Sequence, residues 1–334
     1  GRLLRPSEPP PICPFARKKA RTMLIKEADS RQSDLDELNA LLALPHVDAD
    51  TKQQIRQEIR NIQSGIKGET DAAFQINFHY ENSHKWAVIH DLRLEFEGHA
   101  AQIDHLLINR FLEIYVCESK RFAEGIGFNE HGEFYRYSQG KPYAIESPIE
   151  QNNRHILLLK RLFDSGEIDL PTRLGFRMKP SLHSLILIAN TSAIHRPKNS
   201  KKVGGMDRII KVEQLVKRRD QDLKEENFLQ TVSIVNKFIS TETLQSFAEN
   251  LADLHTPKRK NWKARFGIEE RPSEKEAEPL SSTASGTPQT KRLFCADCKT
   301  PVSPNVAAFC WNKKGRFHGR VYCFDCQRKY KAGS

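Results

Sequence analysis

Three charged residues on two successive strand-like segments form the pattern in this sequence that most resembles a catalytic site. Asp104 lies on the first segment, and Glu118 and Lys120 end the second. Side chains two residues apart on a strand share a face, so we expect Glu118 and Lys120 to point the same way. The tight turn at 110–111 makes the two strands antiparallel neighbours. The spacing therefore predicts that Asp104 lies beside Glu118.

This set of side chains fits the metal-dependent hydrolysis of phosphodiester bonds. A divalent ion neutralises the scissile phosphate and activates a water molecule, and Mg²⁺ or Mn²⁺ prefers carboxylate and carbonyl oxygens as ligands. We expect Asp104, Glu118 and the backbone carbonyl of Ser119 to supply those ligands. Lys120 would orient or deprotonate the attacking water and stabilise the charged transition state.

The alternative interpretation is a surface ion pair between Glu118 and Lys120, because short acidic and basic patterns at strand ends are common. Asp104 favours catalysis, since it lies in the apolar run 103–108, where an unpaired carboxylate is costly to bury. Glu69 is expected to add a third carboxylate from a preceding helix. Gln151 is expected to hydrogen-bond the nucleophile or a ligand carboxylate.

Two histidines adjoin these residues. His105 follows Asp104 directly and should point to the other sheet face, where we expect it to be packed or hydrogen-bonded. His155 lies one helical turn after Gln151 and is within reach of the same cleft, although a packing role is the preferred interpretation.

The elements that must position these residues follow from hydrophobic periodicity and from turn signals. Three helices are expected first, with Gly65 breaking the second from the third; strands, a short hairpin or flap and further helices follow. Their expected ranges are 17–44, 48–64, a helix from about 68, strands 86–96, 102–109 and 112–118, the flap 125–137, helix 149–163, strand 182–190, and a short strand with two helices in 206–255. This order predicts an α/β fold with a central mixed sheet flanked by helices, plus an N-terminal helical hairpin.

Aromatic residues concentrate in the predicted flap. Phe134, Tyr135 and Tyr137 are able to stack on nucleic-acid bases. Packing within the core, or self-association of the flap, is the preferred interpretation.

Composition divides the chain into four parts. Residues 1–64 form a basic, Pro-rich start and a helical hairpin, and residues 65–255 form the catalytic domain. Residues 256–290 are rich in Pro, Ser, Thr, Glu and Lys and are predicted to be a flexible linker. Residues 291–334 form a separate small module.

Cysteines dominate the small module. Cys295 and Cys298 form one CxxC pair, and Cys323 and Cys326 form a second, with 24 residues between the pairs. Two such turns bring four thiolates to one tetrahedral ion, so we expect a structural Zn²⁺ that supplies folding energy to a segment with little core. Cys310 or His318 could replace one ligand, but the two complete pairs already satisfy the ion.

The formal net charge is +11, and the basic residues are concentrated outside the catalytic part. The last 44 residues hold ten Lys or Arg against two Asp, which favours a polyanionic partner. The residues expected to bind nucleic acid are Lys258, Arg259, Lys260, Lys313, Lys314 and Arg316. No signal peptide heads the sequence, and no apolar run reaches the ~18 residues of a membrane span, so we expect a cytoplasmic protein without membrane contact.

Four segments together resemble the nuclease-related domain (NERD) family, which is similar to the PD-(D/E)xK endonucleases, including Holliday-junction resolvases. They are 66–70 (IKGET), 101–108 (AQIDHLLI), 115–120 (YVCESK) and 148–152 (PIEQN). The resemblance covers about residues 65–165. It implies a PD-(D/E)xK-like α/β core, an Mg²⁺-type metal and nuclease activity. Carried over to this chain, it makes Asp104 a metal ligand, Glu118 and Lys120 the ExK pair, Glu69 the acidic residue of the first core helix, and Gln151 the accessory polar residue.

The sequence therefore predicts a metal-dependent nuclease. Its basic zinc module, which resembles a zinc ribbon, is expected to help it bind nucleic acid. DNA is preferred over RNA on the resemblance alone. A catalytically silent protein that recognises DNA ends or junctions is the main alternative, and a zinc-dependent interaction protein is a third.

Overall fold

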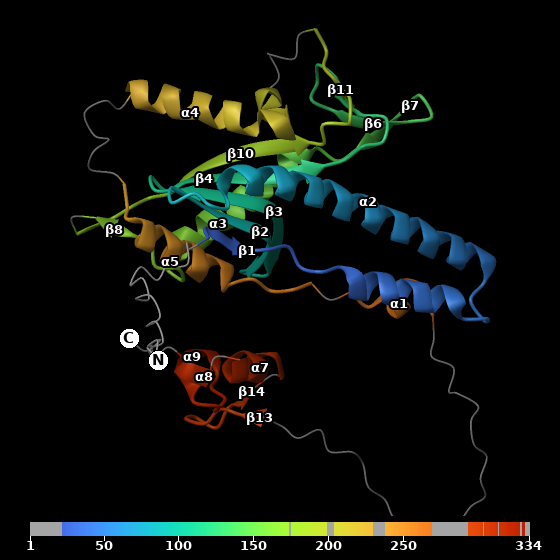
Figure 1. Ribbon diagram of the computed structural model, residues 1–334. Coiled ribbons are helices and arrows are strands. Elements are labelled where there is room, and N and C mark those ends of the chain that lie inside the picture. Colours follow the sequence, from blue (N-terminus) through green and yellow to red (C-terminus); the bar gives the residue numbers. More distant parts are fainter. Residues whose placement is uncertain are drawn as a thin grey trace, which may run out of the picture. The chain divides into compact units, whose positions relative to one another are not determined.

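The computed structural model describes residues 22–173, 175–198, 204–229, 238–258, 260–268, 293–302, 304–312, 314–327 and 329–330 (Figure 1). The chain divides into two compact units, Gly1–Glu270 and Arg271–Ser334, which we describe separately. The Pro-rich start that the sequence predicts lies outside the described residues, as does the predicted linker beyond residue 268.

A six-stranded mixed sheet forms the centre of the first unit. Its spatial order is β1 (Leu24–Lys26), β2 (Trp86–Phe96), β3 (His99–Asn109), β4 (Glu113–Lys120), β10 (Ser181–Ile188) and β12 (Ile209–Lys211). β3 is antiparallel to both of its neighbours, β2 and β4, whereas β10 runs parallel to both β4 and β12. The predicted α/β fold with a central mixed sheet is confirmed, and its three successive strands occur where expected.

Helices cover both faces of this sheet. Apolar residues of α2 (Ala49–Tyr80) pack with Val88, Leu107 and Tyr115 on one face. α3 (Pro148–Ser165) and α5 (Thr241–Ala252) pack on the other face. α4 (Leu215–Leu229) begins on the α2 side. Because both faces are covered, the central strands are buried on both sides, which explains their nearly continuous apolar sequence.

α3 begins where local sequence signals place it. The Ser147 side chain accepts a hydrogen bond from the Glu150 N–H, and Pro148 occupies the first turn, where no N–H is needed. Gly166 ends the helix in the left-handed conformation, with φ 80°. These caps fix where α3 begins and ends, while the packing of Leu159 and Leu162 against the sheet sets which side of the helix faces it.

A second sheet has four strands, of which three lie between β4 and α3 in the chain and the fourth follows β10. Its order is β11 (Ile194–His195), β5 (Ile126–Phe128), β6 (Phe134–Ser138) and β7 (Lys141–Ile145). Phe128 and Phe134 pack with Ile149 of α3 and Ile186 of β10 in one buried cluster. The predicted flap is therefore a hairpin within this sheet, and Phe134 belongs to the core.

The N-terminal helices differ from the sequence prediction. Leu24–Lys26 form a strand beside β2, so the helix predicted over 17–44 is wrong there, and α1 spans only Gln32–Ala43. The break predicted at Gly65 is also wrong, because α2 runs through it without interruption. A helix-interior glycine costs only about 1 kcal/mol, which the packing of the flanking helix outweighs. Gly68 instead allows a close approach, since a Cβ there would lie 2.9 Å from the Cβ of Arg121.

Residues 255–258 and 260–268, which we call the strap, have a defined structure over the first part of the predicted linker. The Thr256 N–H bonds the Arg93 carbonyl at 2.9 Å, and a short helix, α6 (Trp262–Arg265), follows. Trp262 is 0% exposed and lies among Leu38 and Ile55 of the helical hairpin. The prediction of a flexible linker is therefore wrong for the described residues 256–258 and 260–268, because the buried Trp262 side chain packs against α1 and α2.

Trp262→Ala is expected to destabilise the packing of the strap on the helical hairpin by about 3 kcal/mol or more, because it removes a fully buried aromatic side chain. It also removes the 2.9 Å hydrogen bond from the indole Nε1 to Asp34. Faster amide hydrogen exchange in α1 would show the loss. Trp311→Ala is the matched control, since that side chain is 43% exposed. Unchanged exchange in the Trp262 variant would contradict the anchoring role.

The second unit is small. Its described elements are β13 (Leu293–Phe294), β14 (Pro301–Val302), α7 (Pro304–Asn312), α8 (Lys314–Phe317) and α9 (Phe324–Gln327). Phe317 and Tyr322 pack with the cysteines in a single cluster. Among the helices of the described residues in both units, none combines the length and the apolar character needed to span a membrane.

Candidate active site

Asp104 lies where the pairing of β3 with β4 ends. The ladder runs from Ile108↔Ile114 to His105↔Cys117 and stops there. Beyond it, the Oδ2 atom of Asp104 accepts hydrogen bonds from the backbone N–H of Ser119 at 2.7 Å and from the Ser119 hydroxyl at 2.9 Å. The Asp104 carboxylate is therefore held against β4 by Ser119. The sequence did not predict this use of the Ser119 donors.

Glu118 is the centre of the remaining polar contacts. Its Oε1 atom accepts hydrogen bonds from Lys120 Nζ at 2.6 Å and from Gln151 Nε2 at 2.7 Å. The Glu118 side chain is 2% exposed, whereas that of Lys120 is 31% exposed. The structure therefore brings together Glu118 and Lys120 from β4 and Gln151 from α3.

Glu69 approaches this group from α2. It lies with Asp91 and Asp104 in the wall of a pocket of about 420 Å³. Burial, followed by the negative charges of Asp104 and Asp91, raises the pKa of Glu69 to about 7. The structure therefore places the predicted third carboxylate close enough to interact electrostatically with Asp104.

The pKa values of Asp104, Glu118 and Lys120 are all raised within the site. Burial is the main cause that raises the pKa of Asp104, and it also raises the pKa of Glu118 to about 8, with the charge of Asp104 adding to the latter. Burial alone would lower the pKa of Lys120, but its contact with Glu118 and the charge of Asp104 outweigh this and raise it. When they are all ionised, the carboxylates of the site carry more negative charge than Lys120 balances, and their raised pKa values reflect this.

The oxygen atoms of the site fit a hard divalent cation. Both hydrogen bonds recorded for the Asp104 carboxylate fall on Oδ2, which leaves Oδ1 for a ligand role. Glu118 Oε2 is buried and has no hydrogen-bond partner among the described residues. His155 Nδ1 lies 3.7 Å from it, and burial lowers the pKa of His155 to about 4, so the ring is neutral at pH 7. Carboxylate oxygens are the ligands that Mg²⁺ or Mn²⁺ prefers.

Asp91 is a member of the site that the sequence reasoning missed. It lies opposite Asp104, between the pairs His90↔His105 and Leu92↔Ile103, with φ at 52°. Gln102 Nε2 donates to its Oδ1 atom at 2.9 Å. In the sequence, Asp91 is one of several polar residues within a predicted strand. No local sequence pattern predicts its left-handed backbone conformation.

His105 occupies the packed position expected for it. It is 1% exposed, and its Nδ1 atom lies 2.8 Å from Nδ1 of His90, whose Nε2 contacts Asn77 Oδ1 at 2.9 Å. Burial lowers the pKa of both rings to about 3.

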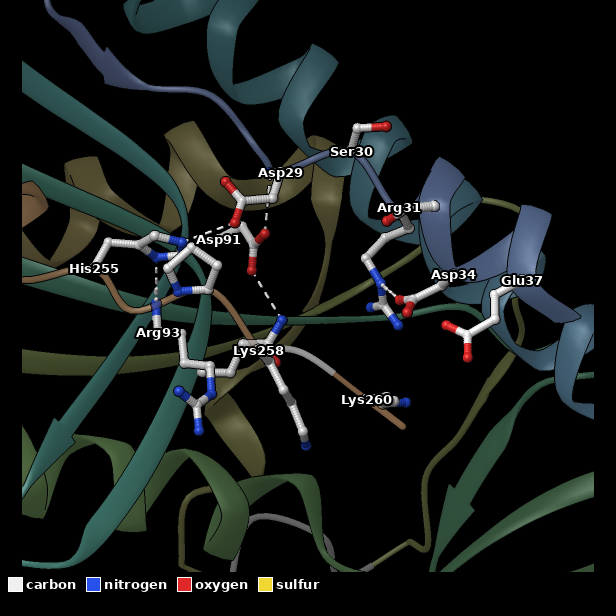
Figure 2. A pocket seen from close by; sticks show the side chains of 13 residues that line it. Asp29, Ser30, Arg31, Asp34, Glu37, Asp91, Arg93, His255, Lys258 and Lys260 are labelled. Atoms are coloured by element: carbon white, nitrogen blue, oxygen red, sulfur yellow. Dashed lines mark hydrogen bonds and ion pairs between the residues drawn. The ribbon is translucent and has the colours of Figure 1, made fainter. Parts of the chain in front are cut away.

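A second pocket of about 520 Å³ adjoins the carboxylate pocket (Figure 2). Asp29, Ser30, Arg31 and Asp91 line both pockets. Figure 2 shows Asp29, Asp91 and His255 gathered on one side, and Arg31 with Asp34 on the other. Segment 29–31 therefore separates the two pockets.

Two of the predicted nucleic-acid-binding residues line this second pocket. Lys258 is exposed there, while Lys260 lies over the Trp262 ring at 4.6 Å and 3.8 Å from Glu58. Arg259 falls outside the described residues. The structure thus brings Lys258 and Lys260 near the carboxylates rather than onto a free linker.

The four predicted cysteines converge in the second unit. Among the described residues they are the group of three or more His, Cys, Asp or Glu whose ligand atoms all lie within 4.8 Å of one another. Hydrogen bonds from the Thr300 side chain and backbone lower the pKa of Cys298 to about 6, which favours the thiolate that binds metal. The four cysteines are therefore able to hold a metal ion such as Zn²⁺.

The other candidates of the second unit lie apart from this group. Cys310 is buried and accepts from the Tyr322 N–H at 3.4 Å, and neither it nor His318 joins the four cysteines. Arg316 donates to the backbone carbonyls of Tyr330 and Gln327 at 2.6 and 3.2 Å, so its guanidinium is engaged within the unit. Lys313 and the side chain of Lys314 fall outside the described residues.

The buried Glu69 carboxylate predicts a pH-dependent stability. Its pKa rises from 4.5 in the unfolded chain to about 7, so the folded protein keeps a proton that the unfolded chain has released. The contribution of Glu69 therefore falls as pH rises from about 4.5 to about 7 and stays low above that. In EDTA, Glu69→Gln should be more stable than the wild type at pH 8 by about 1–2 kcal/mol, allowing for partial solvent exposure, and nearly equal at pH 4.5.

Urea unfolding at both pH values measures this difference. The exposed Glu167→Gln is the matched control and should show no pH-dependent difference. A difference for Glu69→Gln that stays constant with pH would contradict the burial effect.

Residues 64–188 match the family model of the nuclease-related domain. Searches among curated proteins and among solved structures gave no match. The matched range contains Glu69, Asp104, Glu118, Lys120 and Gln151, and it excludes α1, the strap and the four-cysteine group. Residues 64–188, less than half of the chain, are therefore similar to the nuclease-related domain, and this likeness agrees with the predicted PD-(D/E)xK-like core.

Proposed function

We propose that the protein is a divalent-metal-dependent nuclease that hydrolyses phosphodiester bonds in nucleic acid, with DNA favoured over RNA. The observation that supports this most is the burial and hydrogen bonding of the Glu118 carboxylate. Its carboxylate is buried, Lys120 and Gln151 share one oxygen, and the other oxygen has no hydrogen-bond partner among the described residues. A buried carboxylate beside Asp104 needs a cation to be stable in its charged form.

Each residue of the site has a distinct task in this proposal. Asp104 and Glu118 would hold Mg²⁺ or Mn²⁺, which supplies Lewis acidity and an activated water when it is bound. Ser119 keeps Asp104 in place, and Gln151 keeps Glu118 in place, because each donates directly to the respective carboxylate. Such fixed ligands need no reorganisation during the reaction.

Lys120 acts as a positively charged group rather than as a general base. The carboxylates around it raise its pKa, so it stays protonated at neutral pH. It is therefore suited to orient the water and to stabilise the negative charge that develops on the phosphate. Glu69, with a pKa of about 7, is the residue best suited to accept a proton at neutral pH.

The second unit would aid substrate binding. Residues 291–334 carry ten Lys or Arg against two Asp, and the four cysteines would bind one structural Zn²⁺. The proposed organisation thus has a catalytic part, residues 65–255, and a zinc-binding module, residues 291–334, with residues 269–290 as the linker. The helical hairpin and the strap complete the wall of the second pocket.

Incubation with linear, circular and branched DNA tests the function. Cleavage is expected with Mg²⁺ or Mn²⁺ and not with EDTA, and products from circular DNA would show endonuclease action. Binding of DNA without cleavage in any of these metals would overturn the nuclease proposal and favour the silent recognition protein.

A further inference from the structure

The outer face of the second sheet is built differently from its inner face. His195, Gly127, Tyr135 and Ala144 stand in one register row across β11, β5, β6 and β7. Tyr137 follows two residues after Tyr135 and therefore shares its face. Of the residues that alternate with these, Ile126, Phe128 and Phe134 belong to the buried cluster of the inner face, whereas Arg136 and Tyr143, farther along the β6–β7 hairpin, are exposed. The sheet thus turns an apolar face to the body and an aromatic face outward.

The aromatic face is hollowed. A pocket of about 600 Å³ is lined by Tyr135, Tyr137, Pro142 and Ala144, among others. Ala144 stands opposite Tyr135, and Pro142 opposite Tyr137, so small side chains face large rings across the β6–β7 pair. The hollow therefore follows from the choice of residues at paired positions.

The two tyrosine rings are held in place from below and beside. A Cβ at Gly127 would lie 2.3 Å from the Tyr135 ring, so only glycine lets that ring lie against β5. Tyr137 contacts Tyr135 edge-on at 5.4 Å and His195 at 4.5 Å. Both tyrosines remain partly exposed. The rings are fixed yet accessible, which lowers the entropy lost when a flat ligand binds.

This sheet is connected at both ends to the candidate active site. β4 ends at Lys120, and five residues, at most about 17 Å of chain, lead to β5. β7 leads to α3, whose Gln151 binds Glu118. In Figure 1, β6, β7 and β11 lie together at one end of the six-stranded sheet.

We propose that the outer face of the second sheet stacks unpaired bases of the strand that enters the active site. This inference rests on the proposed function and adds its substrate class: nucleic acid that is single-stranded beside the scissile bond. Bases within a duplex are stacked on one another and are not available to tyrosine rings. Two exposed lysines lie near this face: Lys141 begins β7, and Lys198 follows β11. Their positive charges would bind the phosphates of the strand.

Binding measurements on the full-length protein in EDTA test this without cleavage. The probes are a labelled 20-nucleotide strand containing 2-aminopurine and a 20-base-pair duplex. Replacing both Tyr135 and Tyr137 by Leu should weaken single-strand binding at least ~10-fold and abolish the quenching of 2-aminopurine that stacking causes. Replacing both by Phe keeps the rings and should change affinity less than ~2-fold. Duplex binding should be equal in all three proteins.

The outcomes separate this inference from the nuclease proposal. Equal single-strand affinity in the Leu and Phe variants, both with wild-type melting temperature, would overturn the stacking face even if the wild type cleaves DNA. So would a Leu variant that only changes self-association in sedimentation, which would show that a second copy occupies the face. Ring-dependent binding of the single strand by a protein that never cleaves would support the face and overturn the nuclease.

Discussion

Asp104→Asn is expected to reduce metal-dependent cleavage at least ~10³-fold while the protein stays folded. The substitution keeps the shape of the side chain, and its amide oxygen still accepts the hydrogen bonds from Ser119. It removes the charge that, together with Glu118, would hold the metal, and with it several kcal/mol of transition-state stabilisation. Initial rates in Mg²⁺ and Mn²⁺ over a range of metal concentrations measure the loss.

Asp71→Asn is the matched control. Asp71 lies on α2 near Glu69, and its side chain is 49% exposed in an ion pair with Lys67 at 3.5 Å. Such exposed pairs contribute little, so cleavage should be unchanged. Lys120→Ala should resemble Asp104→Asn in rate but not in metal affinity, since Lys120 is not a ligand. Wild-type cleavage by Asp104→Asn would refute the assignment of the site.

Loss of the four-cysteine group is expected to unfold the second unit and weaken nucleic-acid binding, while cleavage remains detectable at high protein concentration. Structural Zn²⁺ contributes about 10–16 kcal/mol to the folding of small domains, far more than so small an apolar cluster supplies. Truncation before residue 291 should remove one Zn²⁺ per chain and ten of the 53 Lys and Arg. The salt dependence of DNA binding should therefore become less steep.

Replacing Cys295 and Cys298 by Ser is the companion variant, because it removes metal ligands and keeps every Lys and Arg. Elemental analysis and a salt titration on all three proteins distinguish the effects of charge from those of the folded unit. Equal salt slopes for the full-length and truncated proteins, or a full-length protein without zinc, would contradict this role.

The elements that the sequence predicted well are those whose signals are local. β2, β3 and β4 alternate with turns and are rich in strand formers, and Ser147 and Pro148 mark the start of α3. The predictions that proved wrong, at Leu24–Lys26, at Gly65 and over the described residues 256–258 and 260–268, involved segments whose structure depends on remote partners. A glycine within a helix has only a weak local effect, and a single tryptophan gives no sign of the cavity that receives it.

The candidate site divides in the same way. Spacing alone determined that Glu118 and Lys120 share a face and that two CxxC turns present four thiolates, because strand periodicity and turn geometry act over a few residues. Only the tertiary structure decided that Ser119 holds Asp104, that Asp91 joins the carboxylates, and that Glu69 has a pKa of about 7. These features arise from desolvation and charge between residues far apart in the chain, and such distances exist only once the helices have packed on the sheet.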